Sequence, residues 1–103
     1  MAARSDLPHL LFFTSERSGP GRRMESLLAQ LGRRERERLR ISRVDTDCSP
    51  KLVGHLDVVE VPTLVLLVGR GPVARIEGRA SAPQIERMLA EHLGSNPNSS
   101  LAA

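Results

Sequence analysis

Cysteine is nearly absent from this chain of 103 residues, which contains Cys48 alone. A single thiol excludes an intramolecular disulfide, a dithiol redox centre and a cysteine-rich zinc site. Histidine is scarce as well, and the three that occur, His9, His55 and His92, are not spaced as metal ligands. We therefore predict neither a metal site nor a cofactor.

Aromatic side chains are limited to Phe12 and Phe13, with no tryptophan or tyrosine. Two adjacent phenylalanines offer no platform on which the bases of a single-stranded nucleic acid could stack. Lys51 is the only lysine among 15 basic residues, a bias that indicates a GC-rich genome. The arginines between residues 33 and 40 are interleaved with glutamates, so we interpret this stretch as a solvated face and expect no nucleic-acid partner.

Long hydrophobic runs are also missing, and none approaches the ~18 residues that a membrane span needs. The N-terminal stretch has no extended apolar segment followed by a small-residue cleavage site, as a secretory signal would. We therefore expect a cytoplasmic protein without a membrane partner. Leu, Ile, Val and Phe still make up 28 of the 103 residues, which is enough for the core of one domain.

Four strands follow from the apolar pattern. Residues 9–14 and 63–68 are short, almost continuous apolar runs, typical of strands buried on both faces. A second strand is predicted to begin at Leu39. After a turn over residues 69–72, the segment from Val73 to Glu77 alternates apolar and polar residues, as expected for a strand with one solvated face.

Three helices are predicted between and after these strands. The first begins near Arg22 and carries an apolar stripe at helical spacing. It either stops at Gly32 or continues for one more turn through the charged residues that follow. The stripe consists of Met24, Leu27, Leu28 and Leu31. A short second helix begins at Ser49-Pro50, with the serine as its cap. The third has a capping box at Ser81 and Gln84 and ends at Gly94.

The resulting order is β-α-β-α-β-β-α, which predicts an α/β fold with a mixed four-stranded sheet and helices on both faces. A right-handed β-α-β crossover makes the first two strands parallel, and a hairpin makes the last two antiparallel. The domain is expected to span residues 9–93, after a loose N-terminus over residues 1–8. Residues 94–103 lack any periodicity and are predicted to be a disordered tail.

Four segments within this frame match one known family. They are Phe12 to Arg22, which includes Ser18-Gly19-Pro20-Gly21; Val44-Asp45-Thr46-Asp47 with Pro50; Val61-Pro62-Thr63-Leu64; and Gly78 after the last strand. Together they resemble thioredoxin, over residues 9–93. The family's first strand and helix have no room here, so the resemblance implies a minimal version of the thioredoxin-like fold.

The departures from the family pattern fall on the residues of its reaction. Ser18 and Gly21 stand where the family has its two motif cysteines. Phe12 replaces a buried carboxylate that assists proton transfer, and Arg17 replaces the tryptophan that covers the motif. Thiol-disulfide exchange needs an attacking thiolate and a second thiol that resolves the mixed disulfide. We therefore expect no catalytic residue and no dithiol activity.

The resemblance implies a binding groove between the turn at residues 18–21 and the loop at Val61-Pro62. In the family the bond before this proline is cis, and the preceding backbone pairs with an extended peptide. Arginines around a helix N-terminus favour an anionic ligand, since free amides and the helix dipole already attract negative charge. The candidate binding residues are Arg17, Ser18, Arg22, Arg23, Val61, Pro62 and Thr63. The expected partner is a peptide or protein, acidic in character.

Other interpretations of these residues remain open. Ser18 is either a helix cap or, in an alternative function, the residue that hydrogen-bonds a glutathione thiolate. Gly21 either gives a ligand room to approach or is simply tolerated. Cys48 is either incidental or the thiol of a monothiol redox protein. Asp45 and Asp47 are interpreted as turn and cap residues rather than metal ligands.

Overall fold

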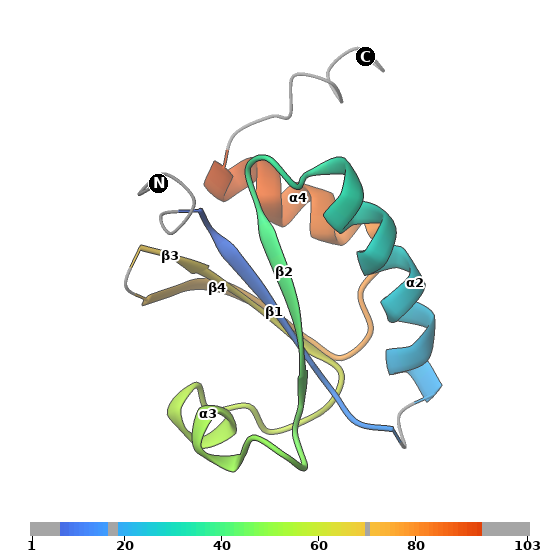
Figure 1. The fold of residues 1–103 in the computed structure, drawn as a ribbon, viewed down its shortest axis with the longest axis vertical. Helices are drawn as coiled ribbons and strands as arrows, with labels where there is room; N and C mark the ends of the chain where they lie inside the picture. Colours follow the sequence, from blue (N-terminus) through green and yellow to red (C-terminus); the bar gives the residue numbers. More distant parts are fainter. Residues whose placement is uncertain (1–6, 17–18, 70, 94–103) are drawn as a thin grey trace.

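The structure, a computed structural model, describes residues 7–16, 19–69 and 71–93 (Figure 1). The disordered tail predicted over residues 94–103 lies outside these ranges, as does the loose N-terminus predicted over residues 1–8 except for its last two residues, which precede β1. The observed elements follow the predicted order. They are β1 (His9–Thr14), α2 (Gly19–Arg34), β2 (Arg40–Asp45), α3 (Pro50–His55), β3 (Thr63–Val68), β4 (Gly71–Glu77) and α4 (Ala82–Leu93). None of the described helices is both long and apolar enough to cross a membrane.

The four strands form one mixed sheet in the order β2-β1-β3-β4. β1 runs parallel to β2 and antiparallel to β3, and β3 pairs antiparallel with β4. Helices α2 and α4 lie on one side of the sheet and α3 on the other (Figure 1). The predicted fold class is thus confirmed.

Two apolar clusters hold the helices to the sheet, and adjacent phenylalanines anchor them. Because successive side chains of a strand point to opposite faces, Phe12 enters the cluster under α2 and α4, and Phe13 enters the cluster under α3. Both rings are buried, with 2% and 0% of their surface exposed. The stripe of α2 packs as predicted, with Met24 and Leu28 buried in the first cluster.

The structure corrects several predicted element boundaries and one cap. Helix α2 begins at Gly19 rather than near Arg22, and it continues past Gly32 to Arg34, as the charged residues after Gly32 allowed. β2 begins at Arg40 rather than Leu39, and β4 begins at Gly71 rather than Val73. Ser49 precedes α3 without a capping hydrogen bond from its side chain, since its backbone angles (φ −133°, ψ 54°) depart from those of a regular cap. The short helix therefore relies on Pro50 and on packing.

The capping box of α4 is confirmed. The Ser81 backbone N–H donates to Oε1 of Gln84 at 2.8 Å, and the Gln84 N–H donates back to Oγ of Ser81 at 3.3 Å. These two bonds satisfy donors that the first turn of a helix leaves unpaired. The sequence signal therefore gave the start of α4 correctly.

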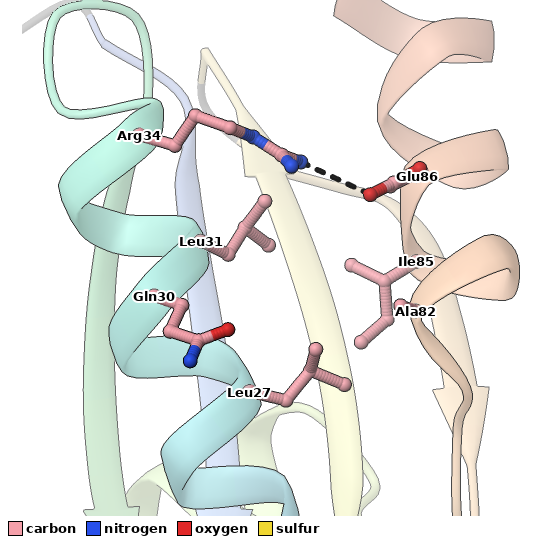
Figure 2. A pocket seen from close by; sticks show the side chains of 7 residues that line it. All are labelled: Leu27, Gln30, Leu31, Arg34, Ala82, Ile85 and Glu86. Atoms are coloured by element: carbon pink, nitrogen blue, oxygen red, sulfur yellow. Dashed lines mark hydrogen bonds and ion pairs between the residues drawn. The ribbon is translucent and has the colours of Figure 1, made fainter. Parts of the chain in front are cut away.

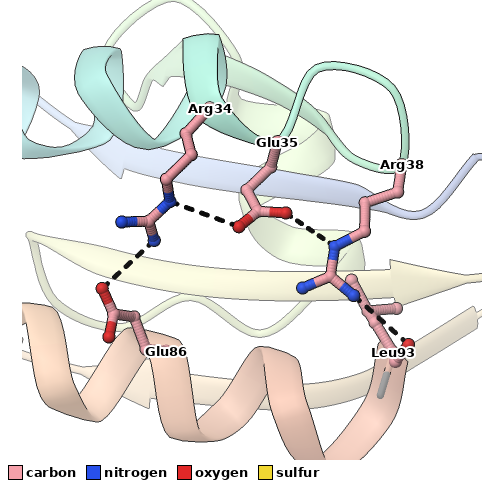
Figure 3. Close-up of polar contacts among 5 residues, drawn as sticks. All are labelled: Arg34, Glu35, Arg38, Glu86 and Leu93. Carbon is pink, nitrogen blue, oxygen red and sulfur yellow. Dashed lines mark hydrogen bonds and ion pairs between the residues drawn. The ribbon is translucent and has the colours of Figure 1, made fainter. Parts of the chain in front are cut away.

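The interpretation of residues 33–40 as a fully solvated face is wrong at Glu35, which is only 3% exposed. Its carboxylate accepts a bond from Nε of Arg38 at 2.6 Å and lies 3.4 Å from Nε of Arg34 (Figure 3). The same two arginines reach α4, where Arg34 pairs with Glu86 and Arg38 donates to the carbonyl of Leu93. A buried carboxylate needs such partners, so these contacts link the end of α2 to α4.

A half-buried polar contact joins β1 to β2, where Nε2 of His9 lies 2.6 Å from Oγ of Ser42. Burial lowers the pKa of His9 from its usual 6.5, and the nearby positive charge of Arg40 lowers it further. The neutral imidazole is thus favoured in the folded state.

This pKa shift predicts a loss of stability at acidic pH. A histidine whose folded pKa is depressed stabilises the fold above its unfolded pKa, near 6.5, and loses that contribution as the pH falls through the folded value. Urea unfolding at pH 7.5 and at pH 5.5 should show a smaller pH-dependent loss for His9→Gln than for the wild type. An equal loss in both proteins would assign the effect to other groups.

Candidate functional site

The predicted groove lies at the end of the sheet where β1 finishes and β3 starts. Antiparallel pairing places Phe13 opposite Thr63, so the chain leaving Thr14 toward α2 runs beside the chain entering β3. We call residues 57–62, which connect α3 to β3, the proline loop. Thr63 therefore begins β3 beside the end of β1, and Val61 and Pro62 precede it in the proline loop.

The proline loop is held in place at its β3 end. The Val61–Pro62 peptide bond is cis, and Pro62 and Thr63 are both buried. The Thr63 hydroxyl donates to the carbonyl of Glu60 at 2.8 Å, and the carbonyl of Pro62 accepts from the Gly78 N–H at 2.8 Å. These bonds fix the loop on both sides of the proline.

Val61 presents its backbone at this site. Its side chain is half-buried, and within the described residues its N–H and C=O make no bond to another backbone group. An N–H and a C=O on one residue, both without a backbone partner, are the groups with which an added strand pairs. Val59, two residues earlier, is 80% exposed and adds an apolar contact that the sequence analysis did not single out.

Gly78, the glycine that the family resemblance marks after the last strand, is required by its conformation. Its φ of +85° lies in the region that favours glycine, and Oε2 of Glu60 would lie 3.4 Å from an added Cβ. The glycine thus permits both the turn after β4 and the close approach of the proline loop. It also brings one carboxylate, that of Glu60, close to the proposed groove.

The N-terminus of α2 carries exposed positive charge. Arg22 and Arg23 are exposed, Nη2 of Arg22 donates to the carbonyl of Glu16 at 3.3 Å, and the first turn has no acidic residue. Two other candidates, Arg17 and Ser18, lie outside the described residues, so the predicted cap by Ser18 has no structural test. The side chains of Pro20 and Gly21 are not described either.

Cys48 lies in the exposed turn between β2 and α3. Its N–H donates to the carbonyl of Asp45 at 3.1 Å, and the Asp47 N–H donates to Oδ1 of Asp45 at 2.8 Å. These bonds confirm Asp45 and Asp47 as turn residues. In the described part of the chain, no group of three or more His, Cys, Asp and Glu residues could hold a metal ion.

An apolar pocket between α2 and α4, the interhelix pocket, was not predicted from the sequence. It encloses about 240 Å³ and is lined by Leu27, Gln30, Leu31, Arg34, Ala82, Ile85 and Glu86. Figure 2 shows Leu27, Leu31 and Ile85 pointing toward one another, with the Arg34–Glu86 ion pair joining the helices at one end. Its lining includes none of the candidate binding residues. The apolar stripe predicted that one face of α2 is buried, but not that α4 packs beside it.

The order of elements, the mixed sheet and the proline loop before β3 together define a thioredoxin-like fold. A family model described as Thioredoxin matches residues 2–91. The chain belongs to the thioredoxin family.

Individual relatives agree with this assignment. A thioredoxin-like protein of Synechocystis sp. is 34% identical over 89 residues, which cover 86% of this chain and 85% of the relative. The thioredoxin of Alicyclobacillus acidocaldarius is 27% identical over 92 residues, which cover 89% and 88% of the two chains. Among solved structures, the germline-specific thioredoxin Deadhead of Drosophila melanogaster matches with a TM-score of 0.81 and 26% identity, covering 89% of this chain and 87% of that one.

Proposed function

We propose that this protein is a redox-inactive member of the thioredoxin family that binds a peptide or protein without catalysis. The observation that carries the proposal is the single thiol of the chain, Cys48, exposed in the turn after β2. One thiolate can attack a disulfide, but a second thiol must resolve the mixed disulfide that forms. The hydroxyl of Ser18 and the hydrogen of Gly21 cannot take the place of that thiol pair.

The proposed binding groove runs between the start of α2 and the proline loop. An extended peptide pairs there with the N–H and C=O of Val61, in the manner of an added strand. Next to this backbone, the exposed side chain of Val59 contributes apolar surface. Backbone pairing gives affinity without sequence preference, so the side chains around the groove must provide the specificity.

Charge favours an acidic ligand at the α2 side of the groove. Arg22 and Arg23 are exposed beside a helix N-terminus, where positive charge is unfavourable until an anion joins it. On the other side, the carboxylate of Glu60 repels acidic groups. We therefore place the acidic residues of the ligand against α2 and its uncharged residues against the proline loop.

A reductase assay tests the absence of dithiol chemistry. In an insulin turbidity assay with dithiothreitol, the protein should match the blank, because no second thiol is present to complete the cycle. The Cys48→Ser variant should behave in the same way. Catalysis by the wild type that is lost in Cys48→Ser would favour the monothiol alternative instead, and catalysis that persists in the variant would contradict the proposal outright.

A titration tests the groove. Acidic and basic peptides of equal length are added to ¹⁵N-labelled protein, and chemical shifts are followed. Shifts at residues 22–24 and 61–63 for the acidic peptide, weakening as salt is added, are expected because exposed arginines are screened. Arg22→Glu should reduce the response, whereas Arg87→Glu, an exposed arginine on α4, serves as the control. Equal responses to both peptides would mean that only general surface charge is acting.

A further inference from the structure

The two edges of the sheet differ in their capacity to pair with another strand. β4 contains Pro72, which has no N–H to donate, and its pairing with β3 shifts register between Leu66 and Leu67. β2 contains no proline and pairs with β1 in an unbroken parallel register from Arg40 to Asp45. Prolines and bulges protect sheet edges from unwanted pairing. Of the two edges, β2 is therefore the one that can accept a further strand.

The backbone groups that face outward along β2 follow from two hydrogen bonds. The N–H of Arg40 donates to Pro8 and the N–H of Thr46 donates to Thr14, both at 2.9 Å. Backbone groups alternate in direction along a strand, so the even-numbered residues face β1. Ile41 and Arg43 consequently direct their N–H and C=O away from the sheet, whereas the outward C=O of Asp45 already accepts the Cys48 N–H.

An apolar pocket opens beside this edge on the α2 side of the sheet. This edge pocket encloses about 290 Å³ and is lined by Phe12, Glu25, Leu28, Ala29, Gly32, Ile41 and Arg43. Gly32 helps to form it, because a Cβ at this position would meet the Cδ1 of Ile41 at 3.6 Å. The Arg43–Glu25 ion pair, with Nε and Oε2 2.7 Å apart, belongs to its polar lining. One apolar side chain of an added strand fits this space.

The opposite face of the same edge carries an unpaired cation. Arg40 is exposed and forms no ion pair with any described residue. Because side chains alternate along a strand, it lies on the same face of β2 as Val44, which packs in the cluster under α3. Neighbouring residues of an added strand point to alternate faces. An apolar residue directed into the edge pocket would thus be followed by one directed toward the face of Arg40.

We propose that β2 accepts an extended segment of a partner protein as a fifth strand, with an apolar side chain in the edge pocket and a neighbouring acidic side chain against Arg40. This site is separate from the groove at the proline loop, which lies where β3 begins. A second copy of this chain suits the edge less well. Antiparallel pairing of two β2 strands around Ser42 would bring the two Arg43 side chains onto the same face.

The experiment uses a synthetic peptide as the probe. An acetylated and amidated seven-residue peptide, Thr-Leu-Glu-Leu-Glu-Leu-Thr, is added to ¹⁵N-labelled protein. The amides of Ile41 and Arg43 should shift and should exchange with solvent more slowly, because their N–H groups become hydrogen-bonded. A peptide with lysine in place of glutamate should bind more weakly. Two further peptides carry N-methyl groups on either the odd-numbered or the even-numbered nitrogens. Only one of the two sets should abolish binding, because only alternate N–H groups of the peptide face β2.

Matched variants separate the two parts of the site. Ala29→Trp fills the edge pocket and should abolish binding, whereas Ala90→Trp, on the exposed face of α4, should not. Arg40→Glu should raise the Kd of the glutamate peptide about five-fold, as expected for the loss of one exposed ion pair of about 1 kcal/mol. Arg87→Glu is the matched control for charge, and it should leave Kd unchanged.

Four results would overturn the proposal. If the amides of Ile41 and Arg43 are protected from solvent exchange in the free protein at every concentration, the chain covers its own edge. Protection that rises with protein concentration would identify a second copy as the occupant. Shifts confined to residues 61–63 would assign the peptide to the groove at the proline loop. No shift at millimolar peptide would exclude strand addition at β2.

Discussion

Arg38→Met is expected to lower the free energy of unfolding by about 3 kcal/mol, because it leaves a buried carboxylate without its closest partner. The side chain of Glu35 is 2% exposed, and Nε of Arg38 lies 2.6 Å from it. The guanidinium of Arg34 also approaches this carboxylate, at 3.4 Å, but 45% of its side chain is exposed, so solvent already weakens that contact. Loss of Arg38 also removes its bond to the Leu93 carbonyl on α4.

Two controls distinguish the ion pair from the general loss of an arginine. Arg36→Met changes an exposed residue of the same segment and should alter stability by less than about 0.5 kcal/mol. The double variant Glu35→Leu, Arg38→Met removes both charges and should recover most of the loss, since apolar replacement of a buried pair is often close to neutral. Urea unfolding at pH 7 measures all three variants. A double variant as unstable as Arg38→Met would contradict this account.

Glu35 also shows where sequence patterns lose their information. Between residues 33 and 40 the charged residues have similar neighbours in the sequence, and alternating charge is typical of an exposed helix face. What buries Glu35 is α4, which arrives some fifty residues later in the chain and brings Glu86 and Leu93 to the same place. No spacing within the segment itself contains that contact.

Long-range contact likewise decides how α3 ends. Arg75 on β4 donates from Nη2 to the Leu56 carbonyl at 2.5 Å and from Nη1 to the Asp57 carbonyl at 3.1 Å. These carbonyls follow a helix whose predicted cap, Ser49, makes no side-chain capping bond. The sequence located α3 through Pro50 but could not show that a residue of the last strand supports its C-terminal end.

Features set by neighbouring residues were predicted well. The capping box at Ser81 and Gln84, the turn at Asp45 and Asp47, and the apolar stripe of α2 all depend on residues at most a few positions apart. The candidate site followed instead from the family motif: Thr63 begins β3 opposite Phe13 of β1, and Val61 and Pro62 precede it in the proline loop. Composition and periodicity alone gave no reason to place a groove there.

Phe13→Ala is expected to destabilise the protein by about 3–5 kcal/mol, the usual cost of removing a buried phenylalanine ring. The ring is 0% exposed and belongs to the cluster that holds α3 to the sheet. Since domains of this size are stable by about 5–15 kcal/mol in total, the variant should melt at a markedly lower temperature. Phe12→Ala, in the cluster under α2 and α4, should cost a similar amount.

The two phenylalanine variants should nevertheless differ at the groove. Leu56 and Val58, which flank the start of the proline loop, pack in the same cluster as Phe13 and not in that of Phe12. A cavity at Phe13 therefore removes support beneath the loop, whereas a cavity at Phe12 lies on the other face of the sheet. At a temperature where both variants remain folded, Phe13→Ala should speed hydrogen exchange over residues 56–62 and weaken binding of the acidic peptide more than Phe12→Ala does. Equal exchange and equal affinity in the two variants would show that the loop is held by its own hydrogen bonds, from Thr63 and Gly78, and not by the packing beneath it.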